Sequence, residues 1–264
     1  MPTSNGYSKR GITILAIASI ALLIFSNAEA ARSRDPGNHT GKGVAAAKAK
    51  DWDKAAAEFT KAIEAQPKDA KNYSNRGEVY KITGKLKEAY ADFTKAIELQ
   101  RNNADAFTDR GQVLLRQKKI DAAVMDFDAA LKISPRDLSA RRFRAYAFMQ
   151  KGQWQKAIDD YTEVLKHSPG DEQALERRGF AYRSLEQYEK AIDDFTALIK
   201  KSPKDPETYR RRAYAYRSTG QYDKAENDLK VILKLRPDDK DAQARLKSVQ
   251  ARSVTAPSAS PVRQ

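Results

Sequence analysis

Residues 172–205 read EQALERRGFAYRSLEQYEKAIDDFTALIKKSPKD, and residues 206–239 follow as PETYRRRAYAYRSTGQYDKAENDLKVILKLRPDD. Both stretches are 34 residues long and contain two segments with apolar residues at helical spacing. A short polar turn, such as Thr219-Gly220-Gln221, separates the two segments, and a proline follows the second one, where it ends a helix. Each stretch therefore predicts a helix, a turn and a second helix.

The period of 34 residues extends over six units without an insertion. Prolines close five of them, at Pro67, Pro135, Pro169, Pro203 and Pro237. A small residue recurs in the first segment, at Gly43, Gly77, Gly111, Ala145, Gly179 and Ala213. The second segment carries an alanine column, at Ala55, Ala89, Ala123, Ala157, Ala191 and Ala225, and a large apolar column, at Phe59, Phe93, Phe127, Tyr161, Phe195 and Leu229. We expect these columns to pack each pair of helices together and to stack the pairs on one another.

This pattern resembles the tetratricopeptide repeat family in length, helix order and the small, alanine, aromatic and proline positions. The resemblance covers about residues 36–237 and implies an all-α, right-handed superhelical solenoid whose first helices line the concave side. The six repeats would span 36–69, which is degenerate, 70–103, 104–137, 138–171, 172–205 and 206–239. Residues 240–252 would then form a solvating helix over the last repeat, and residues 253–264, rich in Ser, Ala and Pro, a disordered tail.

Polar residues recur at the same period. One column is suited to cap the next first helix, at Asp69, Asn103, Asp137, Asp171, Asp205 and Asp239. An arginine column, at Arg76, Arg110, Arg144, Arg178 and Arg212, is matched 16 residues later by Asp92, Asp126, Asp160, Asp194 and Asp228. An arginine column alone would suggest polyanion binding, but residues 16 apart can face one another across a hairpin, so we predict five structural ion pairs. Trp52 and Trp154 share a repeat position that is always large and are predicted to be packing residues.

The N-terminal segment predicts export. Lys9 and Arg10 precede an apolar run from Ile12 to Phe25, and Ala28-Glu29-Ala30 places small residues at a cleavage site. We expect a signal peptide over residues 1–30, cleaved after Ala30, a linker over 31–35, and a mature protein in the periplasm if the source is a Gram-negative bacterium. The alternative is an uncleaved N-terminal anchor, which would bring the chain into contact with a membrane.

The composition narrows the chemistry. The net charge of +14 favours an anionic partner, although export makes nucleic acid unlikely. The chain has no cysteine and only two histidines, so we predict no disulfide, no metal site and no cofactor. It has no phosphate-binding glycine loop, no HExxH motif and no nucleophile elbow. These absences predict a chain that is not an enzyme.

The resemblance also implies which first-helix positions face the groove. In repeats 4 to 6 the candidate contact residues are Arg142, Tyr146, Met149, Arg177, Phe180, Arg183, Arg210, Arg211, Tyr214 and Arg217. Arginine forks bind carboxylates or phosphates, and aromatic faces add apolar area or cation–π contacts. The alternative is that the arginines are merely solvated and the aromatics cover the seam between helices. A carboxylate clamp known in chaperone-binding members is absent, because Thr40, Val44, Asp105 and Asp109 do not match the partners that Asn75 would need.

These observations predict a scaffold or assembly adaptor that binds a protein or peptide partner with acidic groups in the groove of its repeats. The alternative is an anionic envelope polymer or a membrane surface, bound through the overall basic charge. Binding through net charge alone should vanish at moderate ionic strength, whereas binding anchored by aromatic contacts should partly survive.

Overall fold

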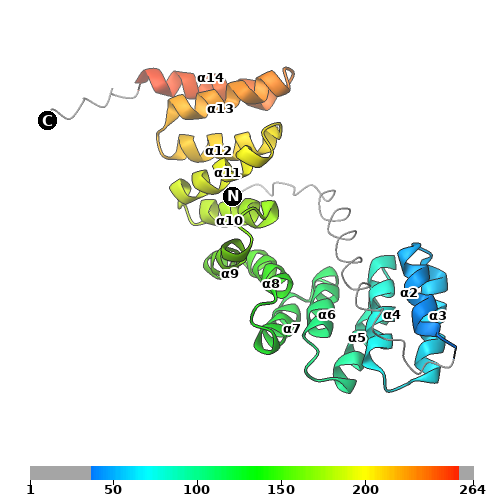
Figure 1. Ribbon diagram of the computed structural model, residues 1–264. Coiled ribbons are helices and arrows are strands. Elements are labelled where there is room, and N and C mark those ends of the chain that lie inside the picture. Colours follow the sequence, from blue (N-terminus) through cyan, green and yellow to red (C-terminus); the bar gives the residue numbers. More distant parts are fainter. Residues whose placement is uncertain (1–36, 256–264) are drawn as a thin grey trace. The chain divides into compact units, whose positions relative to one another are not determined.

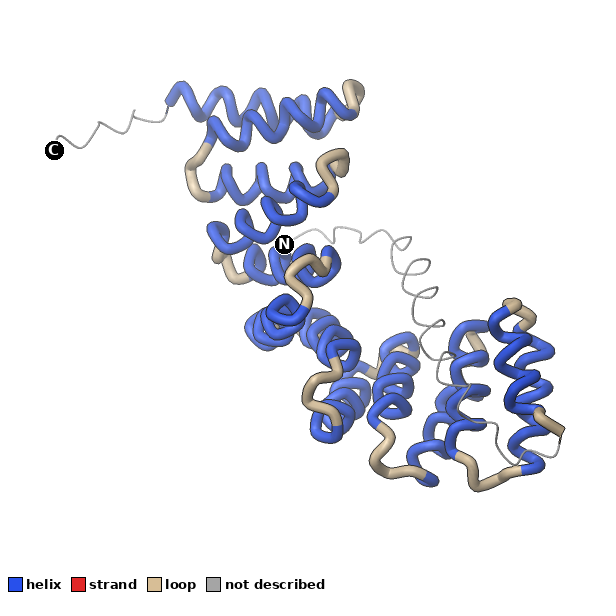
Figure 2. Tube along the Cα trace, viewed as in Figure 1, coloured by secondary structure: helices blue, strands red, loops and turns tan. Residues whose placement is uncertain are grey.

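The computed structural model describes residues 37–255, in which every regular element is an α-helix (Figures 1 and 2). The helices are α2 (His39–Lys48), α3 (Trp52–Ala65), α4 (Ala70–Thr83), α5 (Leu86–Leu99), α6 (Ala104–Arg116), α7 (Ile120–Ile133), α8 (Leu138–Gln150), α9 (Trp154–His167), α10 (Glu172–Ser184), α11 (Tyr188–Lys201), α12 (Pro206–Ser218), α13 (Tyr222–Leu235) and α14 (Lys240–Thr255). The predicted signal segment, the linker and the end of the predicted tail lie outside the described residues. None of these helices is long and apolar enough to cross a membrane.

The chain forms two compact units that divide between Asp137 and Leu138. Unit 1 contains α2 to α7 and unit 2 contains α8 to α14. Within each unit every helix packs against the next one along the chain, and first helices of neighbouring hairpins also touch, as α8 and α10 do. The predicted all-α fold of stacked helical hairpins is therefore confirmed.

The interior of each hairpin holds the columns predicted from the 34-residue period. All six alanines and the five aromatic residues of the apolar column are completely buried. The small residue opposite each ring is required by space: a Cβ atom built on Gly111 would lie 2.5 Å from Cε1 of Phe127. The same close approach occurs between Gly179 and Phe195, at 2.8 Å. Close packing between the two helices thus explains the small column.

The predicted helix caps are also present. Asp69, Asn103, Asp171, Asp205 and Asp239 each accept a hydrogen bond from a backbone N–H two or three residues later. Each of these bonds satisfies a backbone donor that the first turn of a helix leaves without a partner. The sequence therefore marks where the first helix of each of these repeats begins.

All five predicted arginine–aspartate pairs form, each within its own hairpin. In each pair the arginine donates from Nε and a terminal nitrogen to the two carboxylate oxygens, over distances of 2.6 to 2.9 Å. The other terminal nitrogen of Arg76, Arg110, Arg178 and Arg212 donates to a threonine of the preceding repeat, at Thr60, Thr94, Thr162 and Thr196. These arginines therefore join two helices of one hairpin to the hairpin before it.

The last helix, α14, covers the end of unit 2. Ala242 and Val249 are buried against Leu229 and Ile232 of α13. This is the contact predicted for a solvating helix, but α14 ends at Thr255, three residues beyond the predicted end. The extra residues continue the helix because the run from 240 to 255 contains neither glycine nor proline to stop it.

The two tryptophans occupy partly buried positions, one in each unit. Trp52 packs against the buried cluster around Val44 and Phe59. Trp154 meets Phe180 edge to face, with ring centroids 5.7 Å apart. Both are packing residues, as predicted, although Trp154 also supports a residue predicted to contact a partner.

Candidate functional site

The predicted contact residues lie on α8, α10 and α12, and we call the side of unit 2 that they form the first-helix face. In the three hairpins of unit 2, which comprise α8 to α13, the helices carry different cations. The first helices carry arginine and no lysine, at positions 141, 142, 144, 177, 178, 183, 210, 211, 212 and 217. The second helices carry lysine and no arginine, at positions 156, 166, 190, 200, 201, 224, 230 and 234. Net charge alone would not require this division.

Two of the predicted contact arginines form ion pairs with aspartates that cap helices. A terminal nitrogen of Arg142 lies 2.6 Å from Oδ2 of Asp171, and one of Arg210 lies 2.6 Å from Oδ2 of Asp239. Arg210 and the neighbouring backbone hold the pKa of Asp239 below its usual range. In both pairs the aspartate follows the arginine by 29 residues, a spacing visible in the sequence. The cap role had been assigned to these aspartates alone, so their second partner was missed.

Arg211 is also paired, and it borders a small cavity. Its terminal nitrogen lies 3.0 Å from Oε1 of Glu176. The cavity has a volume of about 320 Å³ and is lined by Glu172, Gln173, Glu176, Leu198, Ser202, Asp205, Thr208 and Arg211. Because its charged lining is mostly acidic, this cavity interrupts the arginine-rich surface rather than extending it.

The other predicted contact arginines stack on aromatic rings. The guanidinium of Arg183 lies 4.6 Å from the ring centroid of Phe180 and 5.4 Å from that of Tyr214. Arg217 also lies 5.4 Å from the Tyr214 ring. The ring of Tyr188 approaches Tyr214 at 6.3 Å and supports it from α11. The structure therefore brings Phe180, Arg183, Tyr214 and Arg217 together as a single stack.

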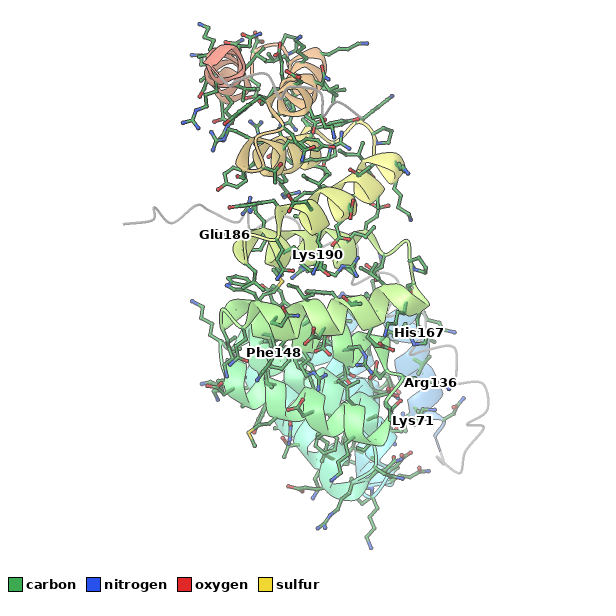
Figure 3. All side chains as sticks on the ribbon, turned by 90° about the vertical axis from the view of Figure 1, so that its left-hand side faces the viewer. Lys71, Arg136, Phe148, His167, Glu186 and Lys190 are labelled. Carbon is green, nitrogen blue, oxygen red and sulfur yellow. The ribbon has the colours of Figure 1, made fainter. Side chains whose placement is uncertain are left out.

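The stack lies near one edge of unit 2. Figure 3 labels Glu186 in the turn between α10 and α11, Lys190 in the first turn of α11, and His167 at the edge opposite Glu186, where α9 ends. Arg183 precedes Glu186 by one helical turn. Glu186 and Lys190 are both exposed, so the approach to this turn is open to solvent.

Farther along the face, Arg177 stacks on Tyr146, with its guanidinium 4.4 Å from the ring centroid. No ion pair holds Arg177 among the residues of 37–255. Met149, in contrast, is only 9% exposed and offers little surface to a partner. The predicted residues thus divide into paired arginines, stacked arginines with their rings, and one buried methionine.

The first-helix face of unit 1 has a different chemistry. Lys81 is buried, with Nζ 2.6 Å from Oε2 of Glu78 and 2.6 Å from Oδ1 of Asp109. Burial raises the pKa of Glu78, although Lys81 opposes that effect. Arginine–aromatic contacts occur on unit 1 too, but there the arginine, such as Arg110 over Phe107 at 5.6 Å, is also ion-paired with an aspartate of its own hairpin.

No group of three or more histidine, aspartate or glutamate side chains within residues 37–255 is arranged to hold a metal ion.

Comparisons with known proteins agree with this geometry. The sequence matches models described as tetratricopeptide repeat over residues 20–70, 108–172 and 143–206, over 182–249, and over 70–103. No curated protein matches the sequence significantly.

Solved structures show the same fold at low sequence identity. YrrB, described as a TPR protein with an unusual peptide-binding site, is 22% identical with a TM-score of 0.66, and the match covers 72% of this chain and 97% of YrrB. PilF of Pseudomonas aeruginosa is 15% identical with a TM-score of 0.65, over 82% of this chain and 96% of PilF. MamA is 21% identical with a TM-score of 0.58, over 63% of this chain and 91% of MamA.

Proposed function

The chain belongs to the tetratricopeptide repeat family of protein-interaction scaffolds, and we propose that it is non-catalytic and binds an acidic peptide or helix on the first-helix face of unit 2. The peptide-binding site named for YrrB supports a peptide as the partner. The residues that carry the proposal are Arg177, Arg183 and Arg217 with their aromatic partners.

The division between arginine and lysine is the observation that carries this proposal. A surface that needed only positive charge would accept either residue, whereas arginine presents a planar fork that fits a carboxylate with two parallel hydrogen bonds. Among the helices of the three hairpins of unit 2, α8 to α13, only those that bear the predicted contact residues contain arginine. The chemistry of the face therefore favours recognition of carboxylates over general attraction to anions.

The aromatic stack prepares Arg183 and Arg217 for this role. The N–H groups of a guanidinium lie in its own plane, so a guanidinium that stacks on a ring directs them outward, where a carboxylate can accept their hydrogen bonds. Tyr214 contacts both arginines, so its ring already restricts their rotamers. Each arginine therefore loses less conformational entropy when it binds a partner. Each charge-assisted hydrogen bond to a carboxylate then contributes about 1.5 to 3 kcal/mol.

A charge-reversal experiment tests the proposal. The probe is a short fluorescein-labelled peptide in which glutamate alternates with leucine, and its affinity is measured by fluorescence anisotropy. We expect the Arg183→Glu/Arg217→Glu variant to bind it at least tenfold more weakly than the unchanged chain, because two carboxylate contacts become repulsive. The same peptide with glutamine in place of glutamate should bind weakly to both proteins.

The matched control is Lys200→Glu/Lys234→Glu, which makes the same change in net charge at equivalent positions of two second helices. Both lysines are exposed, and this variant should bind the peptide nearly as well as the unchanged chain. Equal losses in the two double variants would contradict a site on the first-helix face. They would instead support the alternative, an anionic polymer or membrane surface bound through net charge, especially if binding vanished at moderate salt.

Export of the chain is part of the same proposal, because residues 1–30 have the composition of a signal peptide. Fractionation of the source cells, followed by N-terminal sequencing of the protein, tests it. A mature chain in the periplasm that begins at Ala31 is the expected result. A protein that retains Lys9 and Arg10 in the membrane fraction would support the uncleaved anchor.

A further inference from the structure

Tyr161 places a hydroxyl where the other repeats have none. Its column holds phenylalanine in four repeats and leucine in the last one. The Tyr161 side chain is completely buried, and Oη makes no hydrogen bond with any of residues 37–255. A buried hydroxyl without a partner costs stability that phenylalanine would not cost. Packing therefore explains the ring of Tyr161 but not its oxygen.

The surroundings of this hydroxyl are rich in hydrogen-bond donors. Tyr161 lies on α9, which packs against both α8 and α10. Burial raises the pKa of the phenol, while the nearby charges of Arg177 and Arg142 oppose that shift, so the hydroxyl is neutral and can donate. Arg177 lies close enough to lower the pKa of the phenol through its charge and through a side-chain interaction, but no hydrogen bond joins it to Oη, and its guanidinium stacks on Tyr146.

A second buried donor belongs to Arg142, whose charge also acts on the phenol. Arg142 gives a terminal nitrogen to Asp171, but its Nε is buried and makes no hydrogen bond with the described residues. Arg177 stacks on Tyr146, which follows Arg142 by one helical turn, and both arginines act on the phenol, so the seam holds three donor groups, while Asp171 already accepts from Arg142. A carboxylate, which only accepts hydrogen bonds, matches this set.

We propose that Tyr161, Arg142 and Arg177 form a subsite at the seam of α8 and α10 that binds one carboxylate of an acidic peptide. This subsite rests on the proposed function of the first-helix face and adds a position along the peptide to it. Arg177 is the residue that moves, because it is partly exposed and is held by a stacking contact rather than an ion pair. When Arg177 turns from Tyr146 toward the carboxylate, the Tyr161 hydroxyl gains the acceptor that it lacks.

The Tyr161→Phe variant separates binding from folding. Phenylalanine fills this column in four other repeats, so the variant should fold and should resist urea at least as well as the unchanged chain. Its affinity for the glutamate–leucine peptide should fall about tenfold, since one hydrogen bond to a charged group is lost. Tyr182→Phe is the control, because Tyr182 lies on α10 outside the subsite and should leave affinity unchanged.

A set of peptides in which each glutamate in turn is replaced by glutamine locates the carboxylate. In the unchanged chain one replacement should cost about tenfold in affinity, and in Tyr161→Phe that same replacement should cost little. If the peptide binds and Arg183→Glu/Arg217→Glu abolishes binding, but Tyr161→Phe binds every peptide as the unchanged chain does, the subsite is overturned and the proposed function stands. If the unchanged chain does not distinguish the glutamate peptide from the glutamine peptide, both are overturned.

Discussion

Asp194 forms both of its carboxylate hydrogen bonds with Arg178, yet burial raises its pKa despite that partner. The pair therefore gains little over an apolar contact, but removing one member leaves the other half-buried and uncompensated. We expect Asp194→Asn to lower the free energy of unfolding of unit 2 by about 3 kcal/mol. Urea unfolding in a Trp52→Phe background, followed by the fluorescence of Trp154, measures this change.

Asp193→Asn is the control for that substitution, because Asp193 is the preceding residue on α11 and is exposed. It makes the same chemical change without removing a buried partner of Arg178, so its urea midpoint should match that of the unchanged chain. Equal unfolding curves for Asp194→Asn and Asp193→Asn would show that the arginine–aspartate column contributes no structural ion pair.

Glu58 gives unit 1 a dependence on acid pH. Hydrogen bonds from His39, at 2.7 Å, and from Lys61, at 2.8 Å, lower the pKa of Glu58 from 4.5 to about 2. Because the folded pKa lies below the unfolded value, the stabilisation is complete above about pH 4.5 and is lost as the pH falls toward 2. We therefore expect the free energy of unfolding of unit 1 to fall less between pH 4.5 and pH 2 in Glu58→Gln than in the unchanged chain.

Urea midpoints at pH 5 and pH 3 measure this effect, with Trp154→Phe as the background so that fluorescence reports Trp52 alone. Glu64→Gln, which changes an exposed acid of the same helix, is the control. If the urea midpoint fell as much between pH 5 and pH 3 in Glu58→Gln as in the Trp154→Phe background, groups other than Glu58 would cause the acid sensitivity of unit 1.

At the scale of the element, α14 keeps the last hairpin from exposing its apolar face. Val249 is 1% exposed and lies among Leu229, Ile232 and Ala242. A carboxylate there cannot be solvated while the helix is docked, so Val249→Asp should destabilise unit 2 by about 3 kcal/mol and expose apolar surface that promotes self-association. Urea unfolding and size-exclusion chromatography measure the two effects.

Lys247→Asp is the matched change for Val249→Asp, because Lys247 lies on the same helix and is exposed. It introduces the same side chain without burying it, and should leave both the urea midpoint and the elution volume unchanged. A Val249→Asp protein with an unchanged midpoint would mean that α14 does not protect α13.

The helices and their buried residues could be predicted from the sequence, because the contacts that form them recur with the 34-residue period. The pairing of Arg76 with Asp92 follows from a fixed spacing of 16 residues across a short turn, and a cap such as Asp205 follows from its place before a helix. The threonine column was missed although it has the same period. Nothing in the sequence marks Thr60 as a hydrogen-bond acceptor, and its donor, Arg76, had already been assigned to Asp92.

The contact surface could be predicted less well from the sequence, because it depends on the rotamer that each side chain adopts. The family resemblance placed Arg142 and Arg183 alike on the first-helix face, but the first is bound to Asp171 and the second lies over Phe180. Met149 was expected on the surface and is buried instead. Tyr161 was treated as one more apolar residue of its column, since nothing in the period reveals whether a phenol finds a hydrogen-bond partner.

At the scale of the whole molecule, the net charge of +14 does not describe how the cations are used, because the hairpins of unit 2, α8 to α13, place arginine on their first helices and lysine on their second helices. Charge and fork geometry can be separated by exchanging one residue for the other. Arg183→Lys/Arg217→Lys keeps the net charge but removes the planar fork and weakens its stacking on Phe180 and Tyr214. We expect its affinity for the glutamate–leucine peptide to fall about tenfold, measured by anisotropy at low and at moderate salt. Lys200→Arg/Lys234→Arg, the reverse exchange on the second helices, should not change affinity. If the lysine variant bound as tightly as the unchanged chain at both salt concentrations, positive charge alone would be sufficient and the fork would have no role in recognition.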